Sequence, residues 1–212
     1  MSAGFVSAGW MTLSWVACSR TDAPVFDSDS GGTPSVDSGS VVVATAVEPG
    51  ELVVSEIMPD PNAVDGDFGE FVEVTSLASR ALDLVGLTFA DDDGDGFTVE
   101  GSLVLPVGGR LVFGPSDDAS ANGGVSVDRS YDVEAFKLGN EGDTVSISRG
   151  AVPIDVVVYE AVTWGLTEGA SLSHDPSALD PIRNDDAQSW CIGQSPYGDG
   201  DLGTPGAPND PC

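Results

Sequence analysis

The residues with the clearest spacing for chemistry are three aspartates in the segment DDDGDG at 91–96. Asp91, Asp93 and Asp95 alternate along a tight glycine turn, as in the opening of a calcium loop, and calcium prefers several carboxylate and carbonyl oxygens. An EF-hand loop also needs a glutamate at its twelfth position, where this chain has Ser102. Two interpretations therefore remain: a single calcium site at these aspartates, or a solvated acidic hairpin turn that keeps a sheet edge soluble.

Three glutamates, Glu56, Glu70 and Glu73, lie in or beside apolar segments that read as strands. A carboxylate that faces inward needs a partner, and Arg80, Arg110 or backbone amides could supply it. We therefore expect these glutamates to be structural rather than a catalytic pair, since two close carboxylates arise easily among 35 acidic residues.

Nucleophilic and metal-assisted catalysis find little support. His174 is the single histidine and reads as part of a polar loop, so a catalytic triad is not expected. One histidine and two distant cysteines cannot supply the usual zinc ligands, and no phosphate-binding or dinucleotide fingerprint is found. We predict that the chain is not an enzyme.

Five aromatic side chains allow two interpretations. They could form a stacking platform for a glycan if they are exposed together, or they could pack in the core, which is the commoner fate of such residues. The residues are Trp164, Trp190, Tyr159, Phe136 and Tyr197.

The charge balance restricts the partners. The chain has 35 acidic and 7 basic residues among 212, which gives a formal net charge of -28. Nucleic acid is excluded because phosphate binding needs clustered lysine and arginine, and an anionic bilayer would repel the chain. Divalent cations, cationic partners or simple solubility fit the charge. No apolar run reaches the roughly 18 residues of a membrane-spanning helix.

The N-terminal region reads as an export signal followed by a linker. Residues 1–17 carry no charged side chain and precede Cys18, as in a secretory signal, although a positive first segment is missing. The residues before Cys18 resemble a bacterial lipobox, with Trp15 where that pattern has an aliphatic residue, so Cys18 is either a lipid anchor or near an ordinary cleavage site. Residues 18–48 are rich in Ser, Asp, Gly and Pro and are expected to be a disordered linker. We expect an outer-membrane or cell-surface lipoprotein, or a secreted protein.

Two cysteines remain if Cys18 is modified or removed. In an exported protein, Cys191 and Cys212 are expected to form a disulfide that holds the C-terminal tail to the domain, and two free thiols are the alternative.

Residues 49–212 are expected to form one all-β domain. Short apolar runs separated by Gly, Pro, Asn and Asp predict about eight strands, and strands at this spacing favour a β-sandwich. Val145 and Ile147 are expected to face inward, and residues 52–57 carry apolar groups on both faces, so their strand is expected to lie centrally. The predicted strands are 51–58, 70–76, 82–90, 97–100, 103–106, 110–113, 143–149 and 154–161.

Four segments in order resemble the bacterial branch of the lamin-tail domain family. They are VSEIMPDP at 54–61, GEFVEV at 69–74, LDLVGLTF at 82–89 and GTPGAPN at 203–209. The resemblance implies an immunoglobulin-like β-sandwich that acts as an accessory module of exported or surface proteins and has no catalytic centre. We expect a binding or structural module for a protein or cell-envelope component, with calcium-assisted adhesion or glycan binding as the alternative and a hydrolase with an unrecognised acidic site as the weakest reading.

Overall fold

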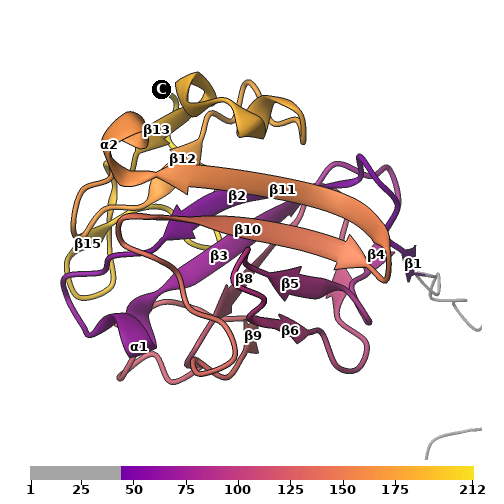
Figure 1. The fold of residues 1–212 in the computed structure, drawn as a ribbon, viewed down its shortest axis with the longest axis horizontal. Coiled ribbons are helices and arrows are strands. Elements are labelled where there is room, and N and C mark those ends of the chain that lie inside the picture. The colour runs from indigo at the N-terminus through magenta and orange to yellow at the C-terminus, as the bar shows by residue number, and fades with distance from the viewer. Residues whose placement is uncertain (1–43) are drawn as a thin grey trace, which may run out of the picture. The chain divides into compact units, whose positions relative to one another are not determined.

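Two β-sheets enclose the core of residues 44–212, the part of the chain that the computed structural model describes (Figure 1). The larger sheet contains, in spatial order, β13 (Trp190–Ile192), β12 (Leu172–His174), β2 (Leu52–Met58), β3 (Phe71–Ser76), β8 (Arg110–Gly114) and β9 (Arg129–Ser130). The other contains β11 (Val152–Glu160), β10 (Gly142–Arg149), β5 (Thr88–Ala90) and β6 (Gly96–Thr98). The predicted immunoglobulin-like β-sandwich is confirmed.

Smaller elements complete the fold. Two further sheets are formed by β1 (Thr45–Ala46), β4 (Leu82–Asp83) and β7 (Val104–Leu105), and by β14 (Pro196–Tyr197) and β15 (Asp201–Leu202). The helical turns are α1 (Gly66–Gly69), α2 (Ala161–Trp164), η1 (Arg183–Asp185) and η2 (Ala187–Ser189). None of the helices in the described residues is long and apolar enough to span a membrane.

Side chains that alternate between the two faces of a strand determine which residues enter the core. Val145 and Ile147 of β10 are fully buried, as predicted, while Ser146 between them is half-buried on the outer face.

The central position predicted for β2 is also confirmed, because β2 lies between β12 and β3. Val54 and Ile57 join the main core, whereas Met58 packs on the opposite face in a second cluster with Phe71 and Val112. Both faces of the strand are therefore buried, which explains its nearly continuous apolar sequence.

The strand predicted at 82–90 is instead two strands in two different sheets. Gly86 turns the chain between β4 and β5 with a φ of 76°, in the left-handed region that favours glycine. The fold also begins earlier than the predicted domain start at residue 49, since β1 pairs with β4 through Thr45 and Leu82. The predicted signal at 1–17, the anchor at Cys18 and most of the linker lie outside the described residues.

The C-terminal segment supplies strands that the sequence did not predict. β12 pairs with β2, with Leu172 opposite Ile57, and β13 continues the sheet. The polar loop predicted around His174 is therefore wrong: His174 belongs to β12 and is fully buried. Its ring packs edge-on against Trp190, with centroids 5.2 Å apart. A strand of three residues is too short to show its alternation in the sequence.

Candidate functional site

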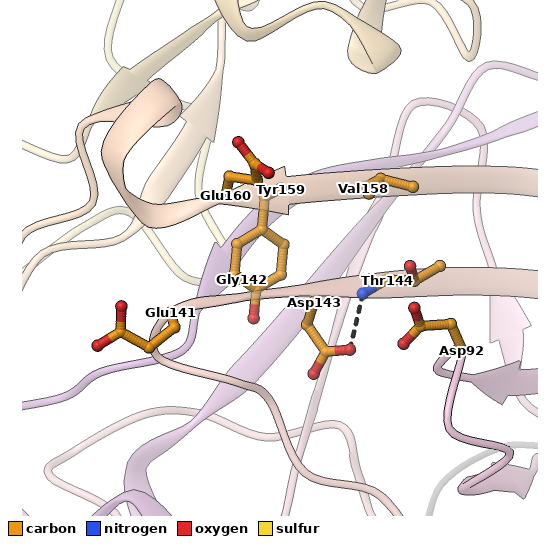
Figure 2. A pocket seen from close by; sticks show the side chains of 8 residues that line it. All are labelled: Asp92, Glu141, Gly142, Asp143, Thr144, Val158, Tyr159 and Glu160. Atoms are coloured by element: carbon orange, nitrogen blue, oxygen red, sulfur yellow. Dashed lines mark hydrogen bonds between the residues drawn. The ribbon is translucent and has the colours of Figure 1, made fainter.

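A hollow of about 280 Å³ lies at one end of β10 and β11 (Figure 2). The antiparallel register places Asp143 opposite Tyr159 and Thr144 opposite Val158. The lining residues are Asp92, Glu141, Gly142, Asp143, Thr144, Val158, Tyr159 and Glu160. The hollow therefore combines the ends of two paired strands with one residue of the loop between β5 and β6.

Glycine at position 142 is needed for the close approach of the two strands. A Cβ built on Gly142 would lie 2.7 Å from the carbonyl oxygen of Tyr159, and the φ of this residue is 141°. Any larger residue would push the strands apart where the hollow forms.

Four carboxylates line the hollow. Two of them have local bonds: Asp143 accepts from the backbone amides of Gly139 and Thr144 at 2.8 and 2.7 Å, and Glu160 accepts from the hydroxyl of Thr163 at 2.9 Å.

The other two, Asp92 and Glu141, are exposed and have no side-chain hydrogen bond to another described residue. Burial, and then the charges of Asp91 and Asp92, raise the pKa of Asp143. The β5–β6 loop is thus close enough to Asp143 for its charges to oppose the ionisation of that carboxyl group.

No basic side chain offsets this charge within residues 44–212. Three ion pairs occur there, between Arg80 and Glu51, Arg110 and Glu73, and Lys137 and Asp67. None involves a residue of the hollow, which therefore favours a cation or a cationic side chain.

The predicted calcium ligands are arranged as a hairpin turn. Oδ1 of Asp91 accepts from the backbone amides of Gly94 and Asp95 at 2.9 and 3.0 Å. In the described part of the chain, no three His, Cys, Asp or Glu side chains are grouped as metal ligands. Asp91, Asp93 and Asp95 therefore lie in an acidic hairpin turn. Calcium binding by these residues stays a prediction.

Glu56 is fully buried and is held by hydroxyl and amide donors. Its Oε1 accepts from the Ser171 hydroxyl at 2.5 Å and from the Thr204 amide at 2.7 Å, and its Oε2 accepts from the Thr204 hydroxyl at 3.1 Å. Burial raises the pKa of Glu56 despite these donors.

Glu73 lies opposite Glu56 on β3 and is also fully buried. It accepts from the Ser55 hydroxyl at 2.7 Å and from the Gly206 amide at 2.8 Å, and Arg110 lies 3.5 Å away as an ion-pair partner. Burial, and then the charge of Glu56, raise the pKa of Glu73 to about 8.

All three glutamates have the protein partners that the structural interpretation requires. Glu70 accepts from the Leu138 amide at 2.9 Å, and burial raises its pKa to about 8. Of the two arginines considered as partners, Arg110 pairs with Glu73, whereas Arg80 pairs with Glu51. All three acids are buried among protein donors.

The aromatic residues pack as expected for core side chains. Phe136, Tyr159 and Trp190 are buried in the main core, Trp164 packs against it, and Tyr197 packs against the second cluster. They do not form an exposed platform, so glycan stacking has no support from them.

Burial lowers the pKa of the buried His174 and favours its neutral form.

The structure pairs Cys191 with Cys212 as a disulfide, with Cα atoms 5.7 Å apart. This pairing matches the predicted one and holds the end of the chain on β13.

Sequence reasoning missed Glu141, Asp143 and Glu160 as members of one site. They are separated from Asp92 by about 50 to 70 positions, and only the register of β10 and β11 brings them together. In a chain with 35 acidic residues, composition carries no signal for this grouping.

Comparison with protein families gives one match. The model of the family described as Lamin Tail Domain matches residues 45–161, from β1 to the start of α2. No curated protein matches this chain.

Proposed function

Because the chain belongs to the lamin tail domain family, an immunoglobulin-like family of non-catalytic interaction domains, we propose that it is an exported or surface-tethered module that binds a protein or cell-envelope component. The hollow at β10 and β11 is the observation that supports a binding role best. It is open, strongly acidic and free of basic side chains among the described residues, whereas the single histidine and the paired glutamates are buried.

Site-specific photo-cross-linking in the producing cells tests the binding role. We expect a photoreactive amino acid at Val158, beside the hollow, to form a covalent adduct with a protein or envelope component. Val104 is the control, because it is similarly exposed on β7 in a different sheet, at 47% against 58% for Val158. Equal labelling from the two positions would contradict the proposal.

Export is supported by the apolar, uncharged segment at 1–17 and by the lipobox-like residues before Cys18. Mass spectrometry of the protein from the cell envelope is expected to show a mature form that begins at or near Cys18, with or without acylation. A cytoplasmic protein that retains residues 1–17 would remove export and tethering from the proposal.

Calcium-assisted adhesion is a second candidate, favoured by the contribution of the DDDGDG loop to the acidic hollow through Asp92. A ligand that binds only the folded state raises Tm. Calcium is therefore expected to raise Tm, and Asp93→Ala is expected to abolish the rise, while the exposed Asp199→Ala retains it. No calcium-dependent change in Tm would exclude this candidate.

A further inference from the structure

The outer face of β11 next to the hollow is apolar and uncovered. Val156 and Val158 are 37% and 58% exposed, and β11 is the edge strand of its sheet. Their partners in register on β10 are Ser146 and Thr144. These four side chains are uncharged in a chain whose formal net charge is -28, and the exposed Glu160 follows Val158 on the same face, at the hollow.

Such a strip is unusual for an edge strand. Edge strands commonly carry charged residues that oppose association, and solvent-exposed aliphatic patches mark interaction sites more often than isolated surface valines do. Beyond the exposed Glu160, Val162 of α2 is a further exposed valine, at 93%.

The strip ends at the acidic hollow, and Val158 belongs to both (Figure 2). Pockets for small-molecule ligands measure roughly 300–1,000 Å³. A hollow of about 280 Å³ lies just below that range, and its size suits a single long side chain. The four carboxylates favour a positive charge at the end of that side chain.

From this arrangement we infer that the occupant is a segment of a partner protein in which a lysine or arginine lies beside small aliphatic side chains. The aliphatic groups cover Val156 and Val158, and the cationic group enters the hollow near Asp92 and Glu141. A second copy of the chain is disfavoured as the occupant, because it carries the same formal charge of -28. The inference rests on the proposed binding function and specifies its partner.

Short synthetic peptides test the partner chemistry on the full chain. The probes are a peptide of alternating lysine and valine, one of alternating lysine and serine, and one of alternating glutamate and valine. The lysine and valine peptide is expected to bind most tightly, to weaken with added salt, and to shift backbone NMR signals of β10 and β11. Equal binding of the glutamate peptide, or signal shifts confined to other strands, would overturn the inference.

Matched variants separate a local effect from an effect of net charge. The double variant D92N/E141Q removes two exposed carboxylates of the hollow and is expected to weaken binding about tenfold, or 1.4 kcal/mol. The double variant D117N/E134Q removes two exposed carboxylates elsewhere and is expected to change binding little. An equal loss in both double variants would overturn the inference.

Val158→Thr tests the apolar strip and is expected to weaken binding of the lysine and valine peptide, whereas its control Val104→Thr is expected to change that binding little. Equal losses of binding in the two variants would overturn the inference.

If the photoreactive group at Val158 forms its adduct while no peptide binds, the partner chemistry is wrong and the binding function stands. If the lysine and valine peptide binds as described while Val158 gives no adduct in cells, the partner chemistry is supported and the proposed cellular function is wrong.

Discussion

Asn209 joins the C-terminal segment to the large sheet through a single side chain. Its amide donates to the carbonyl oxygen of Ser55 at 2.7 Å and to that of His174 at 2.9 Å. These carbonyls belong to neighbouring strands, and the side chain is only 6% exposed. The residue therefore donates to two buried carbonyl oxygens, one on each of two paired strands.

Asn209→Ala is expected to lower the free energy of unfolding by about 2–3 kcal/mol, because it removes hydrogen bonds to two buried carbonyl oxygens. Chemical denaturation measures the change. Asn140→Ala is the control, since Asn140 donates to Asp60 at the surface, and its loss is expected to cost less than about 1 kcal/mol. Equal losses in the two variants would contradict the role of Asn209.

The residue types predicted that the buried glutamates need hydrogen-bond or ion-pair partners, but they did not identify all of those partners. A glutamate within an apolar strand must be paired, so the structural role of Glu56 and Glu73 followed from physical chemistry. Their donors on Ser171, Thr204 and Gly206 lie more than 110 positions away. Loop residues at that separation carry no periodic signal.

At the scale of elements, the sequence predicted the long strands, whose side chains either alternate or form a continuous apolar run. β10 and β2 were predicted because their burial follows from a repeat of two or from a continuous apolar run. β12 and β13 have three residues each and were missed, since β12 joins the sheet by pairing with β2 and β13 joins it by pairing with β12. The hollow was missed for a related reason: it depends on the register between β10 and β11.

The disulfide between Cys191 and Cys212 is expected to stabilise the segment that follows β13. Cys191 and Cys212 are 21 positions apart, and closing a loop of that length in the unfolded chain corresponds to about 3 kcal/mol. A Cys191→Ser and Cys212→Ser double variant is therefore expected to unfold at lower denaturant concentration.

Denaturation with and without a reductant measures this effect. The reductant is expected to destabilise the natural chain and to leave the double variant unchanged. If it leaves the natural chain unchanged as well, the bridge contributes nothing to stability.

For the whole molecule, buried carboxyl groups set the dependence of stability on pH. Burial is the largest cause that raises the pKa of Glu56, of Glu70 and Glu73 to about 8, and of Asp155 to about 7. Between their ordinary values and these raised values, these four groups hold more protons in the folded chain than in the unfolded chain. They outnumber His174, whose lowered pKa acts in the opposite direction. The free energy of unfolding is therefore expected to fall as pH rises from about 5 to 8.

Thermal unfolding across this pH range tests the expectation, and Tm is expected to be higher at the acidic end. Glu73→Gln removes one titrating group and is expected to reduce the slope by at most about 1.4 kcal/mol per pH unit. Glu134→Gln, at an exposed position, is expected to leave the slope unchanged. A Tm that rises steadily from pH 5 to 8 would contradict this account.

The family match ends at residue 161, yet the six-stranded sheet takes two of its strands from beyond that point. A recombinant fragment cut at that boundary would leave β2 with a bare hydrogen-bonding edge and would uncover Glu56 and Glu73 to water. Such a fragment would be prone to aggregate. A recombinant form of this protein therefore needs to extend through Cys212.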